Sequence, residues 1–145
     1  MQDVFLRIKG LYVRKGTDDR LVFETQAKLD KIGTSNVLTY DAPDTTLNKG
    51  GKTKIYFEDN SVALTRDGIP QPFFFEPQKL FLTDYSASGD VCDMLLYPTS
   101  VNTDIRQDSG NIELEYFIIV DGDENFNSIS LEYSVLDNNK NNGGY

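Results

Sequence analysis

Histidine is absent from this sequence of 145 residues, and cysteine occurs only once. Without histidine, the chain has no Ser-His-Asp or Cys-His catalysis, no histidine-bound zinc or iron and no acid–base chemistry by imidazole. Cys92 cannot form an internal disulfide, and it shares a strand face with Met94 and Leu96. We therefore expect a packed, inert thiol in a reducing cytoplasm. We expect no catalytic residues, metal site or cofactor, and a protein that is not an enzyme.

Basic residues and long apolar runs are also scarce. The chain has 14 basic and 23 acidic residues, a net charge of −9 and a pI near 4.4. Such a surface repels phosphate backbones and anionic membranes, so we expect neither as a partner. The longest apolar runs, such as Phe117–Val120, fall far short of the roughly 20 residues that span a bilayer. Charged residues interrupt Met1–Gly10, which therefore has no signal-peptide core, so we expect a cytoplasmic protein.

Apolar and polar residues alternate along most of the chain with a period of two. In Asn111–Val120 the apolar face alternates with Glu113 and Glu115, which predicts a half-buried antiparallel strand. Residues 128–135 repeat the pattern, and the turn-forming cluster Asp121–Asn125 predicts a hairpin between the two strands. Other strands are predicted at 4–13, 21–29, 36–40, 54–57, 62–66, 73–75, 80–85 and 91–97, with 101–106 as another strand after Pro98.

Nine or ten short strands without an amphipathic helix are typical of an all-β protein. Because the strands follow one another as hairpins, the pattern favours an antiparallel up-and-down barrel, whose closure removes exposed edges. We expect residues 1–136 to form this single domain and residues 137–145, rich in Asn and Gly, to be a disordered tail. Residues 43–51 are polar and are predicted to form a loop.

Several short motifs occur in a recognisable order from residue 52 onward. They are Val62–Gly68, a Phe-rich strand, Tyr85–Gly89, Tyr97–Thr99 and Gly110–Tyr116, and Leu38–Asp41 precedes them. In this order the chain resembles the YwiB-like family of bacterial proteins, which is assigned to the calycin-like, lipocalin-type barrels. The resemblance implies a barrel with an interior, and it implies no established activity.

Arg66 shares a strand face with Val62 and Leu64, so it points inward if they do. A guanidinium inside a barrel must be paired or must reach solvent at the rim. A structural arginine would bond carbonyls or a carboxylate such as Asp84 or Asp93, and this is the simpler interpretation. A functional arginine would anchor the anionic headgroup of a ligand.

Two further patterns resemble ligand sites. Tyr40, Tyr85 and Tyr116 could line a pocket with Arg66, or could fill the barrel. The turn that begins at Asp121 imitates a calcium loop, but Phe126 stands where the loop needs glycine and no helices flank it, so it is interpreted as an acidic turn.

Three functions follow from these observations. The first is a non-enzymatic protein that binds a small apolar or amphiphilic ligand inside the barrel, lined by Arg66, Tyr40, Tyr85 and Tyr116. The alternative is a filled barrel that acts as a protein-interaction or structural module, for example as a homodimer. The third, and the least favoured, is a hydrolase that uses a metal held by carboxylates.

Overall fold

The computed structural model describes residues 2–14, 16–42, 51–67, 72–86, 91–120 and 122–136. Side chains are described for all of these except residues 14, 82–86 and 91–93. Within these ranges the chain forms ten β-strands and no helix, so no described segment is a helix that could cross a membrane. Residues 43–50 of the predicted loop and the predicted tail at 137–145 lie outside the described residues, and Gly51, the last residue of that predicted loop, begins strand β4 (Gly51–Glu58).

All ten strands belong to one antiparallel sheet with the order β6-β5-β4-β3-β2-β1-β10-β9-β8-β7. Each strand pairs with its neighbour in sequence except β6 and β7, and the first strand pairs with the last. The strands are β1 (Gln2–Arg14), β2 (Thr17–Ile32), β3 (Ser35–Ala42), β4 (Gly51–Glu58), β5 (Ser61–Arg66), β6 (Phe73–Phe75), β7 (Phe81–Ser86), β8 (Val91–Ile105), β9 (Ser109–Val120) and β10 (Asp123–Val135).

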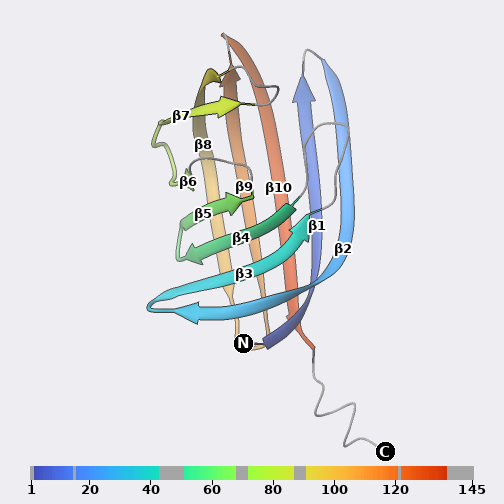
Figure 1. Cartoon of the computed structure of the whole chain (residues 1–145). Coiled ribbons are helices and arrows are strands. Elements are labelled where there is room, and N and C mark those ends of the chain that lie inside the picture. The colour runs from blue at the N-terminus through green and yellow to red at the C-terminus, as the bar shows by residue number, and fades with distance from the viewer. Residues whose placement is uncertain are drawn as a thin grey trace, which may run out of the picture.

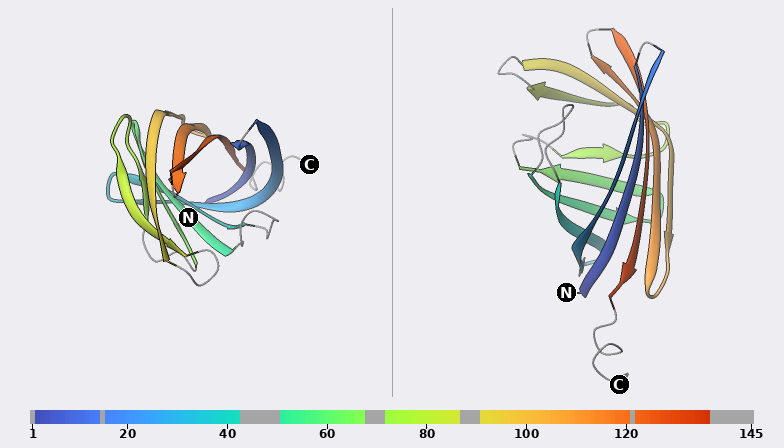
Figure 2. Two further views of the ribbon diagram at one scale, coloured as in Figure 1. Left: turned by 90° about the horizontal axis from the view of Figure 1, so that it is seen from above. Right: turned by 90° about the vertical axis from the view of Figure 1, so that its right-hand side faces the viewer.

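This topology is a nearly closed up-and-down barrel, and it confirms the predicted fold class. The short strands β3, β4 and β5 form one layer, and they cross the long strands β8, β9, β10 and β1 at a steep angle (Figures 1 and 2). The edges of the sheet are β6 and β7, which contact each other without forming a ladder. The arrangement is consistent with the calycin-like barrels that the resemblance implies.

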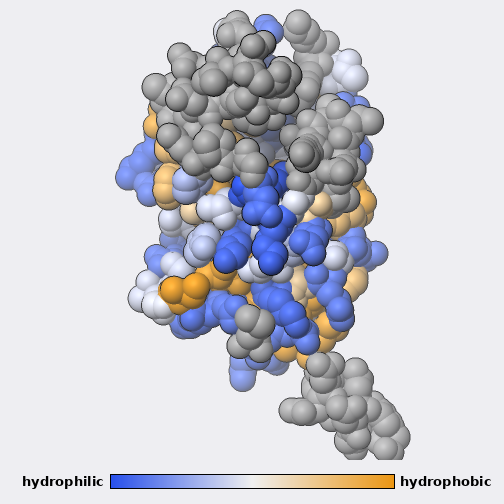
Figure 3. All heavy atoms as spheres, viewed as in Figure 1, coloured by the Kyte–Doolittle hydropathy of each residue, from blue (hydrophilic) through white to orange (hydrophobic). Residues whose placement is uncertain are grey.

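Alternation along each strand separates the interior of the barrel from its surface. In β4 the side chains of Thr53, Ile55 and Phe57 are at most 2% exposed, whereas Lys52 and Lys54 are exposed. The outer face of the β3–β5 layer is accordingly mostly hydrophilic (Figure 3). Aliphatic and aromatic side chains fill the interior between the two layers, and the largest fully buried ones are Phe57, Leu6, Leu38, Leu96, Ile112, Val4 and Val62.

Two predicted boundaries are wrong. The cluster Asp121–Asn125 is not all turn, because Asp123 already pairs with Val120 and begins β10. Only two residues connect the strands, and Gly122 takes the positive φ of 81° that so tight a connection needs. Likewise, β8 continues through Pro98 as one strand, because a bulge between Pro98 and Ser100 shifts the register without ending the pairing with β9.

Candidate functional site

Three neighbouring strands of the shorter layer place polar side chains in one row on the inner wall. Tyr40 in β3 pairs with Thr53 in β4, and Thr53 pairs with Arg66 in β5. Directly paired residues share a sheet face, and Tyr40 and Thr53 are 7% and 0% exposed. The register therefore places the half-buried Arg66 inward, next to the interior residues Val62 and Leu64 of its own strand.

Hydrogen bonds link this row. The Arg66 Nε donates to the Thr53 Oγ1 at 2.8 Å, and the Thr53 hydroxyl donates to the Gly51 carbonyl oxygen at 3.2 Å. The Arg66 guanidinium also hydrogen-bonds the Tyr40 hydroxyl. Within the described residues, no carboxylate forms a salt bridge with Arg66. Its recorded partners there are hydroxyls, rather than the carbonyls or carboxylate expected of an arginine that closes the barrel.

A second polar row lies on the inner wall of the long strands. Tyr12 in β1 pairs with Asn127 in β10, and Asn127 pairs with Tyr116 in β9. Tyr116 and Asn127 are 6% and 4% exposed, and their side chains hydrogen-bond each other. Gly10 leaves room for the Tyr12 ring, because a Cβ at Gly10 would come within 2.8 Å of the Tyr12 hydroxyl oxygen.

The two rows act on each other across the interior. In addition to burial, Tyr12 and Tyr40 raise the pKa of the Tyr116 hydroxyl electrostatically, and the positive charge of Arg66 lowers it. We call the six residues the interior polar ring: Tyr12, Tyr40, Thr53, Arg66, Tyr116 and Asn127. Each residue comes from a different strand, so β3, β4 and β5 on one wall and β9, β10 and β1 on the other each supply one side chain to this polar layer.

Burial sets the protonation of the ring tyrosines. Burial raises the pKa of Tyr116, and the hydrogen bond from Asn127 opposes this rise only partly. Burial also raises the pKa of Tyr40, against the opposing charge and hydrogen bond of Arg66. Both tyrosines are therefore neutral near pH 7, where they can donate and accept hydrogen bonds but do not supply a negative charge to Arg66.

One atom of the ring lacks a partner. In the described part of the chain, the Asn127 Oδ1 is a buried oxygen without a hydrogen-bond partner. Buried polar atoms are nearly always hydrogen-bonded, and an unsatisfied one costs about 1–3 kcal/mol. The ring thus holds both an unused buried acceptor and the positive charge of Arg66.

The barrel interior differs on the two sides of the ring. On the side of Val4, Leu6 and Ile112 the inward side chains are fully buried. On the other side, towards the β1–β2 and β9–β10 turns at the top of Figure 1, the inward Leu21 and Ile118 are only partly buried. Solvent therefore reaches apolar inner wall at one end of the barrel, and the polar ring lies between this wall and the packed core.

Three of the four residues predicted to bind a ligand meet in this ring, namely Arg66, Tyr40 and Tyr116. The side chain of the fourth, Tyr85, lies outside the described residues, as do those of Asp84, Asp93 and Cys92. Asp121 lies there too, whereas Asp123 and Asn125 of the predicted acidic turn belong to β10, and the described residues contain no cluster of three or more metal-ligating side chains.

Sequence reasoning missed Tyr12, Thr53 and Asn127. Each shares its face with buried apolar neighbours, for example Asn127 with Ile129 and Leu131. A polar residue at an inward position of an otherwise apolar strand face was the available signal.

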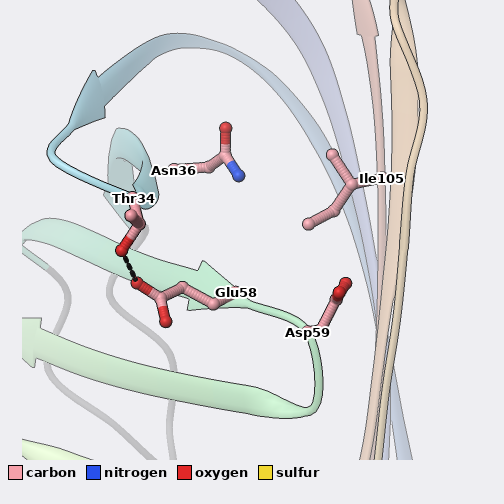
Figure 4. A pocket seen from close by; sticks show the side chains of 5 residues that line it. All are labelled: Thr34, Asn36, Glu58, Asp59 and Ile105. Carbon is pink, nitrogen blue, oxygen red and sulfur yellow. Dashed lines mark hydrogen bonds between the residues drawn. The ribbon is translucent and has the colours of Figure 1, made fainter.

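A separate groove of about 340 Å³ lies between the two layers, at the end of the barrel opposite the β1–β2 and β9–β10 turns, and its Asn36 pairs with the inward Phe57. It is lined by Thr34, Asn36, Glu58, Asp59 and Ile105, from the β2–β3 turn, β3, the β4–β5 turn and the end of β8 (Figure 4). Thr34 and Ser35 donate to the Glu58 Oε1 at 2.6 and 2.8 Å, and these bonds lower the pKa of Glu58. The Glu58 carboxylate thus joins the end of β4 to the β2–β3 turn.

Fold and site together define a nearly closed antiparallel barrel with a polar layer buried at one level of its interior. Comparison with known proteins identifies the family. The family described as a domain of unknown function (DUF1934) matches residues 6–139, so the chain belongs to it. No curated protein matches.

One solved structure has the same fold. The crystal structure of the YwiB protein from Bacillus subtilis superposes with a TM-score of 0.80 at 17% identity, covering 94% of this chain and 93% of that one. This result confirms the resemblance to the YwiB-like family, and at this identity it shows the fold alone. A protein of unknown function from Bacteroides ovatus matches at 9% identity with a TM-score of 0.40, over 92% of this chain and 41% of that one.

Proposed function

We propose that this protein binds a small amphiphilic molecule inside the barrel, with an anionic headgroup at Arg66 and an apolar tail along the partly exposed inner wall. The observation that carries the proposal is the inward Arg66, held by the Thr53 hydroxyl and without a carboxylate partner in the described part of the chain. An amphiphile would match both the charge of the ring and the apolar wall of Leu21 and Ile118 beside it.

Electrostatics support a specific site. With a net charge of −9, the protein as a whole repels anions. An anion that binds at one-to-one stoichiometry would therefore do so through a local cation. Arg66 also suits a carboxylate, because a guanidinium offers several N–H donors in a planar fork.

The role we propose is non-enzymatic. Because burial raises the pKa of both Tyr40 and Tyr116, these hydroxyls are protonated hydrogen-bonding groups near neutral pH and are poor general bases. The ring is thus suited to holding a headgroup and is poorly suited to accepting its protons.

Native mass spectrometry and calorimetry with dodecanoic acid test the proposal. We expect one-to-one binding of the acid and none of dodecyltrimethylammonium, which carries the same chain with the opposite charge. Arg66→Gln should weaken binding of the acid about tenfold or more, because hydrogen bonds to a charged group contribute about 1.5–3 kcal/mol.

Arg20→Gln is the matched control, because Arg20 is exposed and pairs with the outward Leu11. It removes the same charge from the outer surface, and we expect nearly unchanged binding. Equal losses in the two variants, or no one-to-one complex, would contradict the proposal.

A second function, self-association as a homodimer, has its own supporting observation. An outward row of partly exposed apolar side chains crosses four strands, from Val13 through Phe126 and Phe117 to Tyr97. The Phe117 and Phe126 rings lie 5.3 Å apart, edge to face. The same native mass spectra test this alternative, which predicts a dimer that Phe117→Ser dissociates.

A further inference from the structure

The Asn127 Oδ1, a buried acceptor without a partner in the described part of the chain, restricts the ligand more closely than the charge of Arg66 does. We propose that the headgroup carries a hydrogen-bond donor, a hydroxyl or an N–H, a few bonds from its anionic group, and that this donor binds the Asn127 Oδ1. The inference rests on the proposed function, and it specifies the class of ligand as a hydroxylated or amide-bearing carboxylic acid rather than a simple one.

The orientation of the Asn127 amide decides which of its two polar atoms lacks a partner. The hydrogen bond between the Asn127 side chain and the Tyr116 hydroxyl lowers the pKa of Tyr116 against the larger effect of burial. A bond that favours the ionised tyrosine is donated to its oxygen, so the amide nitrogen of Asn127 is the donor. The Oδ1 is thereby left as the free atom, and it is buried without a partner. A carbonyl oxygen only accepts, so its complement must be a donor.

The Asn127 Oδ1 and Arg66 belong to the same polar ring. Tyr116 is hydrogen-bonded by Asn127 and also feels the charge of Arg66, which in turn hydrogen-bonds Tyr40. The acceptor and the cation thus belong to one connected layer, on opposite walls of the interior. A headgroup that bridges the walls needs an anionic end for Arg66 and a donor for Asn127.

The buried acceptor makes the site selective between carboxylic acids. A site with a buried acceptor discriminates against an analogue that lacks the donor, because that analogue leaves the acceptor unpaired. A simple carboxylic acid leaves the Oδ1 unsatisfied, whereas a hydroxylated acid satisfies it. The ring should therefore prefer the hydroxylated acid even though the charge and the chain are the same.

Three acids of equal chain length test the inference on the unmodified protein. By calorimetry, 3-hydroxydodecanoic acid should bind about three- to tenfold more tightly than dodecanoic acid, as one net hydrogen bond allows. The isomer 12-hydroxydodecanoic acid, whose hydroxyl lies at the far end of the chain, should show no such gain. Equal affinities for all three would overturn the inference and leave the proposed function intact, whereas failure of all three to bind would remove both.

Two variants then assign the preference to one atom. Asn127→Leu keeps a similar volume and removes the acceptor. This variant should still bind dodecanoic acid, and it should bind 3-hydroxydodecanoic acid with the same affinity. Asn111→Leu makes the same chemical change on the outer face of β9, at a partly buried position that pairs with Glu132, and should retain the preference. A preference that survives Asn127→Leu would show that another group, or an ordered water molecule, serves the hydroxyl.

Discussion

Replacing Arg66 by methionine removes the charge and the donors of the ring while keeping a long side chain. Two recorded hydrogen bonds are lost, one to the Thr53 Oγ1 at 2.8 Å and one to the Tyr40 hydroxyl. Both partners are buried, and a buried polar atom that loses its partner costs about 1–3 kcal/mol. Because the Thr53 hydroxyl keeps its bond to the Gly51 carbonyl, only its acceptor side is left unpaired. We expect the free energy of unfolding to fall by about 1–3 kcal/mol.

Urea and thermal unfolding followed by circular dichroism measure this loss. For a domain of this size, about 1 kcal/mol corresponds to about 4 °C in Tm, so the expected decrease is about 4–12 °C. Arg20→Met, an exposed charge removal on the outer face, should change stability by no more than about 0.5 kcal/mol. If Arg66→Met is as stable as this control, the free energy that the Arg66 hydrogen bonds contribute only offsets the cost of desolvating the guanidinium. That result would contradict the predicted destabilisation.

Two other predictions concern the tyrosines. Gly110→Ala should destabilise the protein by about 1–3 kcal/mol, because its Cβ would come within 2.5 Å of the Tyr133 ring, and a double-mutant cycle with Tyr133→Leu should recover most of the loss. At alkaline pH, burial keeps the pKa of Tyr40 and Tyr116 above that of unfolded tyrosine, near 10, so the unfolded chain ionises first. Stability should be complete below about pH 10 and decrease above it, and a urea midpoint that stays constant there would contradict this.

The fold could be predicted because the alternation is so regular. Residues Asn111–Val120 show it without a break, and β9 spans nearly the same residues. The three-residue strand Phe73–Phe75 was also predicted with its correct bounds, because a proline lies close to each end. The pairing of β1 with β10 could not be read from the pattern, because alternation shows which face of a strand is buried and does not show its partner.

Only half of the ring could be predicted, for a related reason. Arg66 and Tyr116 lie among hydrophobic residues of clear strands, so their inward direction follows from the period of two. Asn127 lies directly after a run of turn-forming residues that were assigned to the hairpin loop, whereas β10 already begins at Asp123. Tyr12 and Asn127 are brought together only by the pairing of the first and last strands. Two of the three missed residues, Tyr12 and Asn127, therefore depend on the pairing of the first and last strands, whereas Thr53 precedes the predicted strand 54–57 by one residue.

The composition of the ring argues for binding rather than for support alone. A polar layer that only supported the barrel would satisfy its own hydrogen bonds, as buried polar networks generally do. This layer leaves the Asn127 Oδ1 unpaired and faces a partly exposed apolar wall, while aliphatic side chains such as Leu6 and Ile112 fill the interior on its other side. A leucine at position 127 would remove the unpaired oxygen at little cost in volume. Local rules of this kind are most often broken at functional sites, where a ligand completes the missing contacts.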